Sequence, residues 1–161
     1  MRYFIASIVL WCFIACSDHK MDPFEVAVQT EITNIMTKEI ASVGKIIEPI
    51  QVNSLEIEKV SKQEYYNYEW TEQDKIFKKY MELVKKRNFP FSLENGLRHD
   101  SVMSYLEREK AKASTDLEIY KINYHLKAAT QTGKYNQLRT IFLDSSLKKI
   151  EIDYSQGQII K

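Results

Sequence analysis

A ten-residue stretch with a period of two, EIYKINYHLK, places the strongest constraint on how this chain of 161 residues can fold. Apolar side chains fall on every second position: Tyr120, Ile122, Tyr124 and Leu126. Polar side chains fill the positions between them: Lys121, Asn123, His125 and Lys127. Because successive side chains of a β-strand point to opposite faces, this alternation predicts a strand in a sheet with one face in a core and the other in water.

The residues after this strand predict two more strands. A turn is expected at QTGK (131–134), and QLRTIFLD (137–144) then returns as an antiparallel partner. After two serines, KKIEIDY (148–154) predicts a third short strand, and Gly157 a last turn. We therefore expect the C-terminal third of the chain to form an antiparallel β-meander.

Apolar residues at helical spacing mark an element near the start of the chain. Asp22, Pro23 and Glu25 have the order of an N-cap, a proline at the first helical position and an acidic residue at the third. The residues of the apolar stripe are Val28, Ile32, Ile35, Met36, Ile40 and Val43. Gly44 supplies a stop, so a helix is predicted over 23–43.

Pro49 begins an extended segment, IQVNSLEIEKV (50–60), whose alternation slips at Asn53-Ser54. This slip predicts a strand with a β-bulge. The aromatic stretch that follows, YYNYEW (65–70), is expected to be a loop that packs on the core. A platform for carbohydrate or peptide is the alternative for this stretch.

Two further helices are expected before the alternating strand. Thr71 is the predicted cap of the first, whose buried face should carry Ile76, Phe77, Tyr80, Met81, Leu83 and Val84. Pro90 and Gly96 then break the helical pattern. Asp100 or Ser101 should cap the second helix, whose inward residues are expected to be Val102, Tyr105 and Leu106.

The order of these elements is an N-terminal helix, a strand, two helices and a C-terminal antiparallel β-meander. Helices and strands are segregated along the chain, which predicts an α+β fold. Residues 22–161 have a length typical of one domain, and they contain no internal repeat.

The first fifteen residues have the character of a secretory signal. Met1 to Ala15 carry one positive charge, Arg2, no acidic residue and a nearly unbroken apolar run. This run is too short for a membrane span, which needs about 20 apolar residues. The segment Phe13-Ile14-Ala15-Cys16 resembles the lipobox of bacterial lipoproteins, in which the cysteine is lipidated and becomes the mature N-terminus.

The lipobox resemblance implies three parts: a signal peptide (1–15), a lipidated cysteine with a short tether (16–21) and the domain (22–161). Cys12 would leave with the signal and Cys16 would carry the lipid, so the mature chain would have no free thiol. Ser17 and Asp18 follow the cysteine, and by the sorting rules of such lipoproteins they imply the outer membrane, on its periplasmic or its outer face. The closing hairpin, IYKINYHLKAAT to YNQLRTIFLD, is similar to that of small exported lipoproteins of Bacteroidetes-type bacteria that have no assigned function.

Charge and motifs narrow the possible functions. The chain has 23 basic and 22 acidic residues, and loss of Arg2 with the signal makes the counts equal, which disfavours a nucleic-acid partner. None of the motifs HExxH, CxxC, GxSxG or a Gly-rich phosphate loop occurs, and the three histidines, His19, His99 and His125, lie far apart in the sequence. The tripeptide at 99–101 (HDS) is interpreted as a helix start. Glu56 and Glu58 are interpreted as a solvated strand face, with a glycosidase-like pair as the alternative.

These observations favour a non-enzymatic binding or interaction module of the cell envelope. Its ligand site is expected on the aromatic segment, at Tyr65, Tyr66, Tyr68 and Trp70, or on the polar sheet face, at Lys121, Asn123, His125 and Lys127. No cofactor, metal ion or catalytic residue is expected. The expected partners are the membrane, through the N-terminal lipid, and an envelope protein or glycan. The alternatives are an envelope hydrolase that uses dispersed carboxylates, and an inhibitory or structural lipoprotein.

Overall fold

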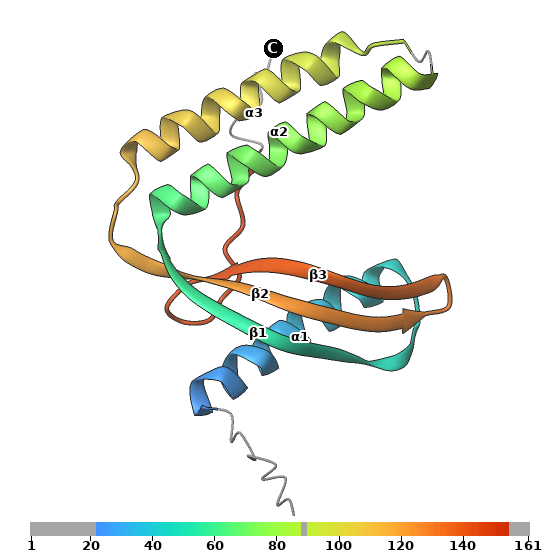
Figure 1. Cartoon of the computed structure of the whole chain (residues 1–161), viewed down its shortest axis with the longest axis vertical. Helices are drawn as coiled ribbons and strands as arrows, with labels where there is room; N and C mark the ends of the chain where they lie inside the picture. The colour runs from blue at the N-terminus through green and yellow to red at the C-terminus, as the bar shows by residue number, and fades with distance from the viewer. Residues whose placement is uncertain (1–21, 88–89, 155–161) are drawn as a thin grey trace, which may run out of the picture.

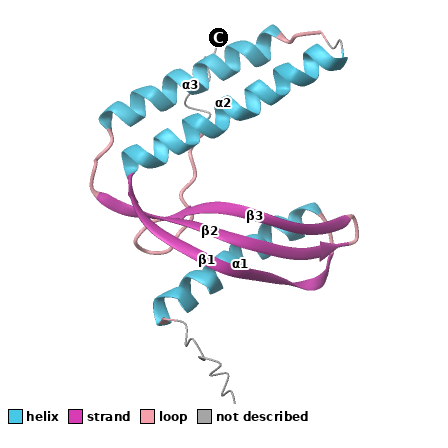
Figure 2. Ribbon diagram, viewed as in Figure 1, coloured by secondary structure: helices cyan, strands magenta, loops and turns pink. Residues whose placement is uncertain are grey.

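The computed structural model describes residues 22–87 and 90–154, and within them it confirms the α+β class (Figure 1). The elements are α1 (Pro23–Val43), β1 (Ile46–Ser61), α2 (Lys62–Arg87), α3 (Leu93–Lys112), β2 (Leu117–Thr130) and β3 (Gly133–Leu143). The three strands form one antiparallel sheet with β2 in the middle. Helix α1 crosses one side of this sheet, while α2 and α3 form a helical hairpin, here called the arm, that lies above the sheet in the view of Figure 2.

Helix α1 has the predicted limits and the predicted caps. The Asp22 carboxylate accepts a hydrogen bond of 3.0 Å from the backbone N–H of Phe24, and Pro23 takes the first helical position. At the other end the N–H of Gly44 donates to the carbonyl of Ile40. The residues of α1 that are buried are Val28, Ile32, Met36 and Ile40, whereas Val43, expected on the same stripe, is 67% exposed because the helix ends beyond the sheet contact.

The core lies between α1 and one face of the sheet. On β2 the buried residues alternate as predicted: Ile122, Tyr124 and Leu126 are at most 1% exposed. The register of β2 with β3 runs without a break from Tyr120 opposite Leu143 to Thr130 opposite Gly133. A period of two therefore sets the face of every residue in this hairpin.

Strand β1 is longer and less regular than expected. It begins at Ile46 rather than at position 50, and its pairing with β2 shifts in four places. One shift lies between Asn53 and Glu56, where Ser54 has a φ of 54°, so the predicted bulge is confirmed. Pro49 lies at another shift, between Glu48 and Gln51, where an edge strand tolerates the loss of a backbone donor.

The third strand of the meander was wrongly predicted: the sheet has its third strand in β1, which pairs with β2, and residues 148–154 form no strand beside β3. Residues 148–154 pair with β3 only where Lys149 bridges to Leu143. The cause is a turn at Asp144, whose carboxylate accepts hydrogen bonds from the N–H groups of Ser146 and Lys148 at 2.8 and 3.0 Å. Past this turn the apolar residues of the segment pack beneath the arm instead: Ile150 and Ile152 contact the cluster of Val60, Tyr65, Ile119 and Phe142. Gly157 lies outside the described residues.

The start of α2 corrects a second prediction. The helix begins at Lys62, directly after β1, and Thr71 lies inside it with its hydroxyl donating to the carbonyl of Asn67. The cap is Ser61: its hydroxyl accepts from the N–H of Glu64 at 3.1 Å, while the Glu64 carboxylate accepts from the N–H of Ser61 at 2.7 Å. This reciprocal capping box places the aromatic segment 65–70 in a helix, not in a loop.

The start of α3 corrects a third prediction. The hydroxyl of Ser92 accepts from the N–H of Asn95 at 3.3 Å, so the helix begins at Leu93 instead of Asp100 or Ser101, and it includes Gly96. The expected inward side of α3 is confirmed at Val102 and Leu106, which are buried.

The predicted buried face of α2 is only partly covered. Ile76 and Leu83 are 60% and 44% exposed. Its other four residues, Phe77, Tyr80, Met81 and Val84, are half-buried. Among the α2 residues whose side chains are described, only Tyr65 is buried, at the root of the arm. Beyond that root α2 packs mainly against α3, and its contacts with the sheet are few.

Candidate functional site

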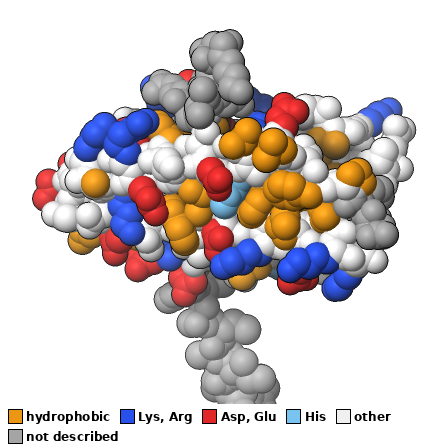
Figure 3. Space-filling model, turned by 90° about the horizontal axis from the view of Figure 1, so that it is seen from above, with side chains coloured by type: hydrophobic (Ala, Val, Ile, Leu, Met, Phe, Trp, Pro, Cys, Tyr) orange, Lys and Arg blue, Asp and Glu red, His pale blue; other side chains and the backbone are white. Residues whose placement is uncertain are grey.

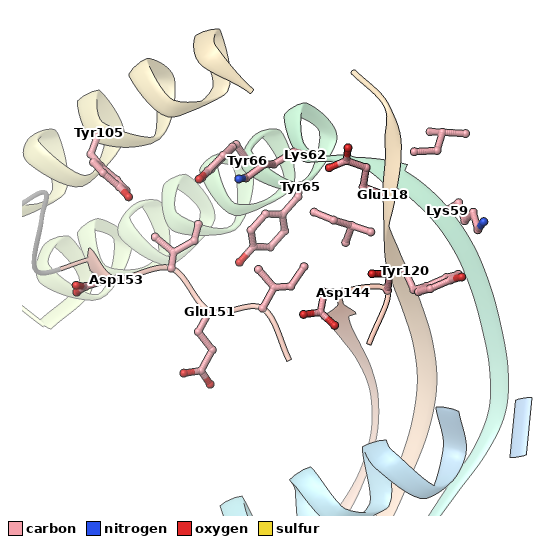
Figure 4. A pocket seen from close by; sticks show the side chains of 15 residues that line it. Lys59, Lys62, Tyr65, Tyr66, Tyr105, Glu118, Tyr120, Asp144, Glu151 and Asp153 are labelled. Atoms are coloured by element: carbon pink, nitrogen blue, oxygen red, sulfur yellow. The ribbon is translucent and has the colours of Figure 1, made fainter. Parts of the chain in front are cut away.

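A cavity of about 660 Å³ lies where the root of the arm, the start of β2 and the segment after β3 meet. We call it the junction pocket (Figure 4). Its volume falls within the range of about 300–1,000 Å³ that is usual for small-molecule sites. Four tyrosines from three elements line it: Tyr65 and Tyr66 of α2, Tyr105 of α3 and Tyr120 of β2.

The tyrosines give the junction pocket aromatic walls with polar tips. Tyr65 is 3% exposed and packs on Phe142 with ring centroids 4.8 Å apart. Burial raises the pKa of the Tyr65 hydroxyl. Burial also raises the pKa of the Tyr66 hydroxyl, and the neighbouring Tyr105 and Glu109 raise it further. Tyr66 and Tyr105 point toward one another from α2 and α3 in Figure 4. The hydroxyls of Tyr65 and Tyr66 are therefore neutral at pH 7, and each can both donate and accept a hydrogen bond.

Four acidic side chains also line the junction pocket. They are Glu118 of β2 and three residues of the segment after β3: Asp144, Glu151 and Asp153. Two lysines, Lys59 and Lys62, oppose these four carboxylates, so acidic charge prevails. The site therefore offers many hydrogen-bond acceptors beside aromatic faces.

The structural roles of Asp144 and Glu151 are visible in their hydrogen bonds and ion pairs. Asp144 holds the turn after β3. Glu151 pairs with Lys149 at 2.8 Å, and this hydrogen-bonded cation lowers the pKa of the Glu151 carboxyl. Glu151 is consequently a carboxylate at neutral pH, an acceptor of hydrogen bonds rather than a source of protons.

The predicted aromatic site is divided by the helix that carries it. Tyr65 and Tyr66 line the junction pocket, but Tyr68 packs edge-on against Phe142 at 4.9 Å and lines a separate groove of about 270 Å³. Trp70 is half-buried, and its indole N–H is buried without a hydrogen-bond partner among the described residues. Tyr65 and Tyr68 are three residues apart and both pack on Phe142, whereas Tyr66 is turned by about 100° from Tyr65, so the four rings do not form one platform.

The predicted polar sheet face is largely paired within itself. Lys121 donates to Glu58 at 3.0 Å, and the Asn123 amide donates to Glu56 at 3.2 Å. Asn123 also accepts from the hydroxyl of Thr140 at 2.8 Å. Of the other two predicted residues, His125 is half-buried and Lys127 is exposed. Glu56 and Glu58 thus serve as cross-strand partners, as the solvated-face interpretation implies.

Several residues of the junction pocket were not predicted as site residues. Tyr105 and Tyr120 were expected to face inward, and both are half-buried beside the cavity. Tyr120 also contacts Phe24 of α1, with ring centroids 5.0 Å apart. The three acidic residues after β3 were expected in or beside a strand. The high tyrosine content of the chain was the only local signal for such a site.

His99 lies within α3, so the interpretation of residues 99–101 as a helix start is wrong. Its ring stacks on Phe77 at 3.9 Å with an angle of 14° between the planes, and its Nδ1 lies 3.4 Å from Asp100.

Over residues 22–87 and 90–154 we find no group of three or more His, Cys, Asp or Glu side chains arranged for a metal ion. No helix in the same ranges combines the length and apolar character of a membrane span. Cys16 and His19 lie outside these ranges.

No known protein family, curated protein or solved structure matches this chain. The resemblance to exported lipoproteins consequently remains a prediction that depends on the lipobox-like residues and the closing hairpin.

Proposed function

We propose that the chain is a lipid-anchored, non-enzymatic binding module of a bacterial cell envelope, and that its ligand occupies the junction pocket. The observation that carries this proposal is the convergence of four tyrosines and four carboxylates on one open cavity. Tyrosine rings pack against apolar faces of a ligand, while their hydroxyls and the carboxylates accept hydrogen bonds from ligand hydroxyl or amine groups. An envelope glycan has both kinds of surface.

The pKa of Glu151 fits a binding role better than a catalytic one. A glycosidase needs one carboxyl with a raised pKa to act as the general acid. In the junction pocket the hydrogen bond from Lys149 lowers the pKa of the Glu151 carboxyl, so this group is suited to accept hydrogen bonds from a ligand. A hydrolase with dispersed carboxylates remains the second candidate, and its distinguishing result would be turnover of the bound glycan.

The position of α1 agrees with attachment through the N-terminus. In Figure 1 the start of α1 and the arm lie at opposite ends of the molecule. A lipid on Cys16 would hold the α1 end near the membrane and direct the arm away from it. Two or more acyl chains are needed for stable anchoring, as in lipidated bacterial proteins.

Binding to an array of bacterial glycans tests the pocket. We expect Tyr105→Ala to weaken the interaction at least about tenfold, equivalent to about 1.4 kcal/mol. Tyr80→Ala, a tyrosine of the arm outside the junction pocket, is the matched control and should bind as the unmodified chain does. Loss of binding in His125→Ala with full binding in Tyr105→Ala would instead assign the ligand to the sheet face. If no glycan binds, this ligand class is wrong.

Metabolic labelling with a fatty-acid analogue tests the anchor. Cys16→Ser should abolish labelling and leave unprocessed precursor, whereas Cys12→Ser should be labelled and processed normally. Equal labelling of Cys16→Ser and the unmodified chain would contradict the lipoprotein assignment. Protease treatment of intact cells then distinguishes the faces of the outer membrane, because only a surface-exposed domain is digested.

A further inference from the structure

Strand β3 forms an edge of the sheet, and most of that edge has no partner among the described residues. Along its outer side only the last residues pair: the carbonyl of Phe142 accepts from the N–H of Ile150 at 2.9 Å, and Leu143 bridges to Lys149. The chain then leaves the sheet toward the arm. Residues 134–141 consequently form an open edge on which no described strand lies.

The Phe142 contact also fixes which backbone groups face outward. In an antiparallel strand the N–H and C=O of alternate residues point to the same side. Because the carbonyl of Phe142 points outward, so do the backbone groups of Thr140, Leu138 and Asn136. No hydrogen bond joins these groups to any described residue. The backbone groups of Gln137, Arg139 and Ile141 point toward β2 instead.

The two edges of the sheet differ in how they are protected. Edge strands normally carry prolines, bulges or inward charges that prevent another chain from pairing with them. On β1 the register shifts in four places, and Pro49 removes one donor. On β3 the register is continuous, and the strand contains neither a proline nor a bulge. The β3 edge is thus the one suited to accept a further strand.

Leu138 lies at the middle of this open edge. It is 74% exposed, more than any other large hydrophobic side chain of the described residues. Asn136 and Thr140 flank it on the same face. An added strand would both cover Leu138 and satisfy the outward backbone groups, which are two independent sources of affinity.

The arm decides between a single added segment and a second copy of the chain. In Figure 1 the middle of β3 lies on the side of the sheet that faces the arm, while α2 makes its main contacts with the sheet at β1 and β2. A second copy that paired through its own β3 would add three strands on this side, each about 4.8 Å from the next, and would extend the sheet toward the arm. One extended segment would add only one strand, about 4.8 Å from β3. The chain already places residues 148–150 beside the end of β3 as such a segment. We propose that the open edge of β3 binds an extended polypeptide segment of a partner protein as a fourth strand.

Amide hydrogen exchange on the full chain provides the test. A displayed library of extended peptides is selected against the chain, and the strongest peptide is synthesised and added in excess. We expect the amides of Asn136, Leu138 and Thr140 to exchange more slowly when the peptide is bound. Gln137 and Arg139, already paired with β2, should be unchanged, so protection should follow a period of two.

Variants of Leu138 separate backbone pairing from folding. Leu138→Pro removes an outward N–H and leaves the ladder with β2 intact, so peptide affinity should fall at least about tenfold. Leu138→Val retains the donor and an apolar side chain and should bind normally. If Leu138→Pro does not fold, Leu138→Lys tests the edge in a second way: it keeps the backbone donor but places a charge on the edge strand, which disfavours pairing with another chain, so peptide affinity should again fall.

Three results would overturn the proposal. The first is that the library yields no peptide that protects the three outward amides. The second is that the selected peptides protect residues of the arm or the junction pocket instead. The third is that the chain dimerises with rising concentration and protects the same amides without peptide, which would make a second copy the occupant.

Discussion

Helix α1 and the arm have the same kind of sequence pattern but very different burial. On α1 the residues of the apolar stripe that face the sheet are at most 4% exposed. On α2 a stripe of similar spacing leaves Ile76 and Leu83 largely in solvent. The difference is the partner surface. A sheet presents a broad apolar face to a helix, whereas in the arm each helix covers only one side of the other.

Ion pairs on the arm do not replace that missing core. Lys75 pairs with Glu72 and Lys78 with Asp74, both at 2.6 Å on the surface of α2. Exposed pairs of this kind contribute about 0.3–0.5 kcal/mol each. The outer part of the arm should accordingly open more readily than the sheet with α1, because local stability follows buried apolar contact.

The largest expected effect is in the core of the sheet. Ile122 of β2 is fully buried in the core beneath α1, so Ile122→Ala should lower the free energy of unfolding by roughly 2–5 kcal/mol. Urea unfolding curves measure the change. The control is Lys121→Ala on the opposite face, where the ion pair with Glu58 is partly exposed and the loss should stay within about 0.5 kcal/mol. Equal losses in the two variants would contradict the assigned faces.

The next effect is at the junction between sheet and arm. Ser61 caps α2, so Ser61→Ala should cost about 1 kcal/mol, the usual loss for an N-cap serine. Exchange of the amides in the first turns of α2 should rise more than exchange in β2. An unchanged unfolding curve would show that the hydrogen bonds of this cap contribute nothing to stability.

Glu64→Gln tests the charge in the same cap. Hydrogen bonds from Ser61 lower the pKa of the Glu64 carboxyl from its usual value near 4.5. Because the folded pKa is the lower one, the carboxylate stabilises the fold fully above the unfolded pKa and progressively less as pH falls through the folded pKa. The stability difference between the unmodified chain and Glu64→Gln should therefore be present at pH 7 and disappear in acid. A difference that is independent of pH would contradict this assignment.

Local patterns predicted the elements whose signals lie within a few residues. The caps of α1 and the alternation of β2 are such signals, and both elements were correctly placed. Ser61 was not predicted as a cap because Thr71, later in the sequence, matched the pattern of a helix cap more closely. Ser92 was not predicted because glycine at position 96, which usually breaks a helix, follows it. The third strand failed for a different reason: KKIEIDY has the right alternation, but the turn at Asp144 directs it beneath the arm.

The candidate site was less predictable than the fold because it depends on segments distant in the sequence. The junction pocket combines Tyr66, Tyr105 and Glu118 with residues after β3, and no periodicity within one segment reveals that they meet. On the arm, too, a pattern within one segment did not reveal what covers it. In Figure 3 hydrophobic side chains appear on the surface seen from above, on both sides of the histidine, where the sequence pattern predicted a covered face.

A smaller and opposite effect is expected at Gly96 in the arm. A Cβ at this position would lie 2.8 Å from Cζ of Phe91, the far end of a side chain that is 46% exposed and can rotate away. Since glycine is a poor helix former, Gly96→Ala should stabilise the chain by about 0.5–1 kcal/mol. Thermal unfolding measures the gain. Phe91→Ala in combination should not reduce it, and destabilisation by Gly96→Ala alone would mean that the Phe91 ring is held in place.

The smallest effect is expected at Ile76, the direct counterpart of Ile122. Ile76→Ala removes the same atoms from a side chain that is 60% exposed, and alanine favours a helix slightly more than isoleucine does. The free energy of unfolding should therefore change by no more than about 0.5 kcal/mol. If Ile76→Ala costs as much as Ile122→Ala, the arm is covered in solution and the contrast with α1 fails. Repeating the measurement at several protein concentrations then identifies the cover, because burial by a second copy would make the loss grow with concentration and burial within one chain would not.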